Sequence, residues 1–67
     1  MSNPSSFVSL AAMMDYTQRS GKDATIKGKY AILRVRWKHS KIWFFVNGWH
    51  VKKEVAQAIC SYINEEG

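Results

Sequence analysis

The chain has 67 residues and a formal net charge of +5. A chain this short is expected to form one domain, residues 1–67 with a flexible tail over residues 1–4, and buries only about 60% of its unfolded surface. Its single cysteine, Cys60, excludes an internal disulfide and is typical of a reducing compartment, so we expect a cytoplasmic protein. No apolar run reaches the length of a membrane span and the N-terminus has no basic region, so neither a membrane segment nor a secretory leader is expected.

The basic residues are concentrated in the middle of the chain. All ten Lys and Arg residues fall between Arg19 and Lys53, where Asp23 is the only acid, so this stretch has a net charge of +9. Such a footprint suits a polyanion, although a lysine-rich surface also serves solubility alone. We therefore expect nucleic acid as the partner.

A first helix is predicted ahead of the basic stretch. Ser5 or Ser6 is expected to cap a helix that runs to about Arg19 and stops at Gly21. Its apolar stripe is Phe7, Leu10, Ala11, Met14 and Thr17, widened by Met13 and Tyr16. The basic loop that follows has room for a short strand over residues 24–27.

Residues 30–46 predict an antiparallel β-hairpin. Residues 30–38 alternate between apolar and polar side chains, and residues 42–46 are an aromatic and β-branched run. The turn has two residues, His39 and Ser40, or four, and both lengths give the same symmetric register. In that register Trp37 faces Ile42, Val35 faces Phe44 and Leu33 faces Val46. One face of the hairpin is therefore wholly apolar, and Trp37 is predicted to be buried on it.

The other face of the hairpin is basic and aromatic. In the same register Arg36 lies opposite Trp43 and Arg34 lies opposite Phe45, within cross-strand contact distance. Guanidinium groups beside aromatic rings are a common surface for nucleic acid, but Arg stems also shield rings from water with no ligand involved. The predicted nucleic-acid-binding residues of this face and its turn are Arg34, Arg36, Lys38, Lys41 and Trp43. A register slip of one residue would exchange the two faces.

The last third of the chain predicts a turn and a second helix. Asn47-Gly48 is the strongest turn dipeptide present, and it leads either into a third strand over residues 49–51 or directly into the helix. The apolar stripe of that helix is Val51, Val55, Ala58, Ile59, Tyr62 and Ile63, which places Cys60 at the flank of the helix. The predicted fold is thus α+β, a helix, an antiparallel hairpin or three-stranded meander, and a C-terminal helix, with both helices on the apolar face of the sheet.

Lys52 and Lys53 are predicted in the first turn of the second helix. The helix macrodipole disfavours each cation there by about a few tenths of a kcal/mol. Two lysines beside exposed N–H groups form an anion-binding corner, and phosphate is the usual anion. The alternative is that Glu54 offsets the lysines and nothing binds.

Two segments resemble the double-stranded RNA-binding domain family. Residues 15–21, DYTQRSG, resemble the end of the first helix of that family, and residues 52–55, KKEV, resemble the start of its second helix. The resemblance implies a three-stranded antiparallel sheet between two helices. It also implies that Lys52 and Lys53 hold phosphates across a major groove and that the first helix touches a minor groove near Asp15.

The sequence offers no catalytic or metal-binding constellation. The five acids form no paired pattern, and His39, His50 and Cys60 lack the spacing of metal ligands. The glycines also lack the spacing of a phosphate-binding loop. We therefore expect no enzymatic activity, no cofactor and no metal.

The expected function is binding of duplex nucleic acid through backbone phosphates. RNA and DNA both stay open, because a two-stranded ribbon that carries Arg34 and Arg36 also fits a DNA major groove. The alternative is a protein-interaction module, such as a small inhibitor of a host enzyme or a homodimeric adaptor. Its contact surface would be the Arg and aromatic face.

Overall fold

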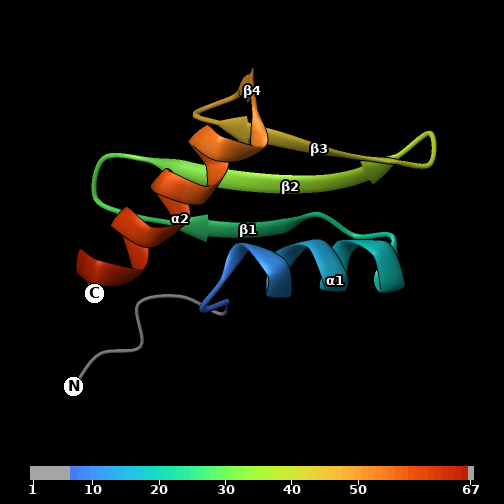
Figure 1. Cartoon of the computed structure of the whole chain (residues 1–67), viewed down its shortest axis with the longest axis horizontal. Coiled ribbons are helices and arrows are strands. Elements are labelled where there is room, and N and C mark those ends of the chain that lie inside the picture. Colours follow the sequence, from blue (N-terminus) through green and yellow to red (C-terminus); the bar gives the residue numbers. More distant parts are fainter. Residues whose placement is uncertain (1–6, 67) are drawn as a thin grey trace.

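The computed structural model describes residues 7–66. Its elements are α1 (Leu10–Ser20), β1 (Ala24–Lys27), β2 (Ile32–Lys38), β3 (Lys41–Val46), β4 (Trp49–Val51) and α2 (Lys53–Glu66). The four strands form one antiparallel sheet in the order β1-β2-β3-β4 (Figure 1). This is the predicted α+β order, and both of the short strands that the sequence allowed are formed.

The central hairpin has the predicted register. The confirmed pairs are Leu33 with Val46, Arg34 with Phe45, Val35 with Phe44, Arg36 with Trp43 and Trp37 with Ile42. The turn has two residues, His39 at φ 55° and Ser40 at φ 60°, both in the left-handed region. Asn-Gly is the preferred pair for such a turn, and His39-Ser40 is a different pair. The alternation of apolar side chains, rather than the turn sequence, therefore fixes this register.

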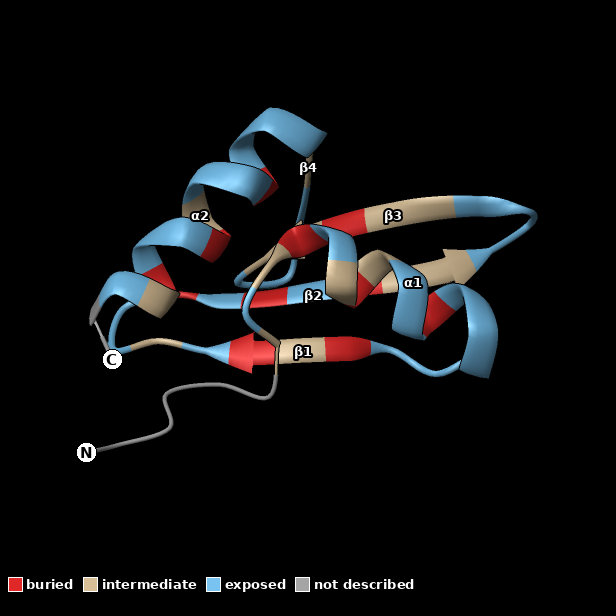
Figure 2. Cartoon of the chain, turned by 60° about the horizontal axis from the view of Figure 1, so that its bottom comes forward, coloured by how far each residue is buried: buried red, intermediate tan, exposed pale blue. Residues whose placement is uncertain are grey.

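Both helices lie on the same face of the sheet. In Figure 2, α1 lies in front of the strands and α2 stands above them to the left, and both helices carry buried positions, coloured red. The core between the two layers consists of Leu10, Met13, Ala24, Ile26, Ala31, Leu33, Val35, Phe44, Ala56, Cys60 and Ile63. Within residues 7–66, neither helix covers the opposite face of the sheet.

The first helix begins later than the pattern of apolar residues suggested. Ser9 is its N-cap, with an extended backbone and a side-chain oxygen that accepts a hydrogen bond of 3.1 Å from the N–H of Ala12. The predicted caps, Ser5 and Ser6, lie outside the described residues. Ser9 suits the role because its hydroxyl satisfies one of the free N–H groups of the first turn.

The C-terminal end of α1 confirms the predicted stop. Gly21 adopts φ 74°, a left-handed conformation that favours glycine, and its N–H donates to the carbonyl of Thr17 at 2.9 Å. The buried side chains of the helix are Leu10, Met13 and Thr17, whereas Ala11 is exposed. The buried stripe is thus rotated slightly from the predicted one.

The second helix buries a different side from the predicted stripe. Ala56, Cys60 and Ile63 face the sheet, whereas Val55 and Tyr62 are 44% and 36% exposed. Both possible stripes share Ile59 and Ile63, so apolar spacing alone could not choose between them. Small residues at the centre of the contact let the helix axis come close to the sheet, which larger Val and Tyr side chains would prevent.

Two further predictions about burial were wrong. Cys60 is 1% exposed in the core rather than at the flank of the helix, and burial raises the pKa of its thiol, against a smaller opposing effect of the hydrogen bond from Asn64. Trp37 lies on the helix-covered face as predicted, but it is only half-buried and stands outside the core cluster. Its place beside the hairpin turn leaves less of the molecule to cover it.

Candidate nucleic-acid interface

The face of the sheet opposite the helices, hereafter the open face, gathers cations and aromatic rings. Directly paired residues of neighbouring strands point to the same side, so the register fixes its members. They are Thr25, Lys27, Ile32, Arg34, Arg36, Lys38, Lys41, Trp43, Phe45 and His50. Five of these positions are Lys or Arg and none is an acid. The open face is therefore a strongly basic surface built on a rigid sheet.

Three rings form a continuous cluster on the open face. The ring of His50 lies 5.1 Å from that of Trp43 and 5.8 Å from that of Phe45, measured between ring centroids, and both pairs are tilted. The indole N–H of Trp43 donates to the backbone carbonyl of Lys38 at 3.0 Å, which fixes the orientation of the ring. The guanidinium carbon of Arg36 lies 5.8 Å from the Phe45 centroid, within the range of a cation–π contact.

Among the described side chains, Asp23 is the one acid that forms an ion pair with cations of the open face. Its carboxylate accepts two hydrogen bonds from Arg36, from Nε at 3.1 Å and from Nη2 at 3.0 Å, a bidentate pair. Arg34 Nε lies farther away, at 3.8 Å from Oδ2. The hydrogen bonds from Arg36 lower the pKa of Asp23, with smaller Coulombic contributions from Arg36 and Arg34 acting against partial burial. At neutral pH this carboxylate therefore neutralises part of the charge that the open face presents.

Replacing Asp23 by Asn should raise affinity for a polyanion and lower stability slightly. One additional free cation corresponds to roughly an 8-fold gain in affinity at 0.1 M salt and a salt slope steeper by about 0.9. The exposed ion pair contributes about 0.2 to 1 kcal/mol to the free energy of unfolding. Because the folded-state pKa is depressed, that contribution is present above the unfolded pKa and disappears as the pH falls through the folded one. Thermal melts over a pH series and binding titrations check both effects.

The matched control is Asp15→Asn. Asp15 pairs with Arg19 on α1, at 3.1 Å, and the substitution changes the total charge by the same amount. An equal gain in affinity for both variants would mean that net charge, and not the open face, governs binding.

The structure brings five of the predicted binding residues together and separates the other two. Arg34, Arg36, Lys38, Lys41 and Trp43 all lie on the open face. The backbone carbonyl of Lys52 accepts a hydrogen bond from the N–H of Ala56, so Lys52 caps α2. Lys53 is the first residue of that helix, which lies on the other side of the sheet. Lys53, the second lysine of the pair, therefore belongs to a second surface.

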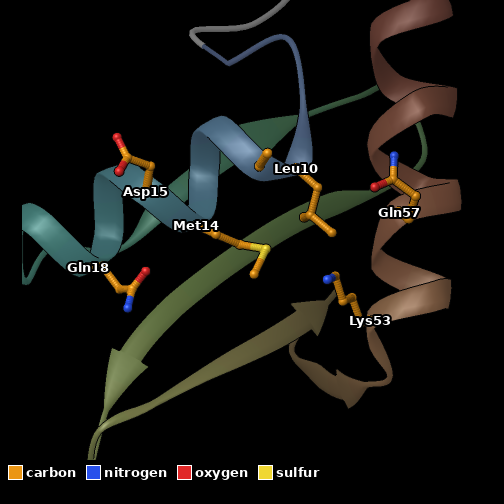
Figure 3. A pocket seen from close by; sticks show the side chains of 7 residues that line it. Leu10, Met14, Asp15, Gln18, Lys53 and Gln57 are labelled. Atoms are coloured by element: carbon orange, nitrogen blue, oxygen red, sulfur yellow. The ribbon is translucent and has the colours of Figure 1, made fainter.

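That second surface is a groove between α1 and α2, shown in Figure 3. It has a volume of about 330 Å³ and is lined by Leu10, Ala11, Met14, Asp15, Gln18, Lys53 and Gln57. Leu10 and Met14 point into the gap between the helices, and Lys53 reaches toward it from the start of α2. The two segments that resemble the double-stranded RNA-binding domain family thus meet at this groove.

The sequence analysis did not identify Lys27 and His50 of the open face, or Asp23, the acid that pairs with its arginines. His50 was within reach of prediction, because a two-residue turn at Asn47-Gly48 places it opposite Phe45. Lys27 depended on the pairing of β1, whose loop to β2 has no turn signal that fixes a register. Asp23 lies before β1, and nothing in its sequence neighbourhood indicates that it pairs with Arg36, thirteen residues away.

Other kinds of site find little support in the described part of the chain. No group of three or more His, Cys, Asp or Glu side chains among the described residues is placed to hold a metal ion. Among the helices that the structure describes, none combines the length and the apolar character needed to cross a bilayer. Comparisons with protein-family models, curated proteins and solved structures found no match. The absence of enzymatic activity and the cytoplasmic location stay predictions.

Proposed function

We propose that this chain is a small basic module that binds duplex nucleic acid, RNA or DNA, through backbone phosphates held by the open face. The observation that carries the proposal is the occupancy of that face by five Lys or Arg side chains and no acid. Duplex DNA has one phosphate charge per about 1.7 Å of axis, so a flat cationic surface meets several phosphates at once.

The number of phosphate contacts follows from the pairing on the face. Arg36 is already held by Asp23, which leaves Lys27, Arg34, Lys38 and Lys41 as the principal cations. They come from β1, β2 and β3, so they spread across the width of the sheet rather than along one strand. Such a spread suits a surface that follows a backbone and does not read base sequence.

The proposal is tested by titrating labelled blunt duplexes of RNA and of DNA with the protein and following fluorescence anisotropy at several salt concentrations. Four phosphate contacts predict a log–log salt slope of roughly −3.6 on DNA and a Kd of about 10⁻⁶ to 10⁻⁴ M at physiological salt. Little dependence on base sequence is expected. Absence of binding to both duplexes at about 50 mM salt would exclude the proposal.

A protein partner is the second candidate function, and exposed apolar side chains favour it. Trp49 on the edge strand β4 is 77% exposed, and Val55 and Tyr62 on α2 are also accessible. Large exposed aromatic residues are enriched at protein interfaces. Sedimentation that gave a concentration-dependent mass, with no affinity for either duplex, would favour a second copy of the chain as the partner.

A further inference from the structure

Phosphate binding does not account for the ring cluster of the open face, which consists of Trp43, Phe45 and His50. A duplex keeps its bases stacked inside, where only their edges reach the grooves, so rings on a flat sheet gain nothing from paired bases. Unpaired bases expose their faces, and aromatic side chains on a sheet stack on them. Trp43, Phe45 and His50 form a contiguous surface of this kind.

The placement of the rings relative to the cations fits one strand of nucleic acid. Neighbouring strands of a sheet are about 4.8 Å apart, so the outward residues of β2 and of β3 form adjacent rows. The row on β2 is basic, with Arg34, Arg36 and Lys38, and the row on β3 ends in Trp43 and Phe45. A single strand likewise has its phosphates on one side and its bases on the other. Arg34 and Lys38 of the basic row can therefore hold phosphates while the rings receive bases.

The ring of Trp43 is held in place before any ligand arrives. Its N–H is bonded to the Lys38 carbonyl, and its ring contacts that of His50, which is itself exposed to solvent. A ring already fixed in position loses little conformational entropy on binding. Trp49 differs from Trp43 in both respects. It is 77% exposed, and the register places it on the helix side of the sheet, opposite Val46.

We infer that Trp43, with His50 and Phe45, forms a stacking site for unpaired nucleic-acid bases. The inference rests on the proposed function, because the cations of the same face hold the phosphates beside the rings. The bases come either from a free single strand or from an unpaired overhang next to a duplex.

The test separates stacking from phosphate binding by using an abasic strand. Labelled single strands of equal length, one with bases and one with abasic sugars throughout, carry the same charge and differ only in what the rings can contact. The wild-type protein is expected to bind the base-bearing strand about 5- to 150-fold more tightly for each base that stacks. A blunt duplex and the same duplex with a short overhang form the second comparison, and the overhang should raise affinity over a similar range.

Matched variants locate the site. Trp43→Ala should bring the two single strands close to equal affinity while leaving the affinity for the abasic strand unchanged. Trp49→Ala, the same substitution on the other side of the sheet, should keep the full preference. His50→Ala changes an exposed residue and should also reduce the preference for the base-bearing strand. This second variant tests the site even if Trp43→Ala does not fold.

The outcomes distinguish failure of the two proposals. Equal binding of both single strands by the wild-type protein, with duplex binding present, would overturn the stacking site and leave phosphate binding standing. Absence of binding to every strand and duplex would overturn both. A gain for the free single strand with none for the overhang would identify the free strand as the source of the bases.

Discussion

Phe44→Ala is expected to unfold much of the protein at 37 °C, whereas Phe45→Ala, the same change at the next residue, should leave it folded. Phe44 is 8% exposed and belongs to the core cluster on the helix-covered face. Truncating a buried Phe costs about 3 to 5 kcal/mol. Domains have a total stability of about 5 to 15 kcal/mol, and one this short belongs at the low end.

The ring of Phe45 faces the other way and lies on the open face. It contacts the imidazole ring of His50 and the guanidinium group of Arg36. Loss of such contacts lowers the free energy of unfolding by on the order of 1 kcal/mol. Urea unfolding followed by circular dichroism compares the two variants directly. A larger loss of stability for Phe45→Ala would mean that something covers the open face in solution or that the faces are exchanged.

The register that separates these two residues could be predicted because two independent signals agreed. The alternation from Leu33 to Trp37 required one apolar side, and the aromatic run after the turn supplied its partners at matching positions. A slip by one residue would have put Arg34 and Arg36 against the helices, at a large cost in unpaired charge. The hydrophobic pattern was therefore sufficient to define the open face.

The packing of the helices could not be predicted in the same way. Helix α2 carries apolar residues over more than half of its circumference, so periodicity allowed two stripes that share Ile59 and Ile63. The choice depends on how closely the helix approaches the sheet, which is a property of side-chain volumes on both layers. Ala56 and Cys60 permit the close approach and so become the centre of the contact.

The candidate site was predictable in its cations but not in its electrostatic balance. Arg34, Arg36, Lys38 and Lys41 follow from the hairpin register alone. The neutralisation of Arg36 by Asp23 depends on the path of the chain into β1, which no local pattern defines. The sequence consequently overstates the charge that is free on the open face.

Lys38→Gln combined with Lys41→Gln should cause a large loss of duplex affinity. The two lysines pair directly across β2 and β3, at the end of the open face beside the turn. Loss of two phosphate contacts predicts a salt slope weaker by about 1.8 and an affinity roughly 60-fold lower at 0.1 M salt. Like charges directly opposite each other destabilise a sheet, so the variant should be as stable as the parent or slightly more so.

The matched comparison is Lys52→Gln combined with Lys53→Gln. This variant removes the same charge from the start of α2, where Lys53 lines the groove between the helices, and relieves an unfavourable interaction with the helix dipole of up to about 1 kcal/mol in total. Loss of binding in either variant therefore cannot be attributed to unfolding, and thermal melts verify this.

If phosphates bind at the open face, the Lys52 and Lys53 variant should keep its affinity within about 3-fold, and its salt slope should be almost unchanged. The resemblance to the double-stranded RNA-binding domain family predicts the reverse order. If the α2 variant alone loses affinity and slope, phosphates bind at the groove between α1 and α2, and the cations of the open face serve solubility or a protein partner instead.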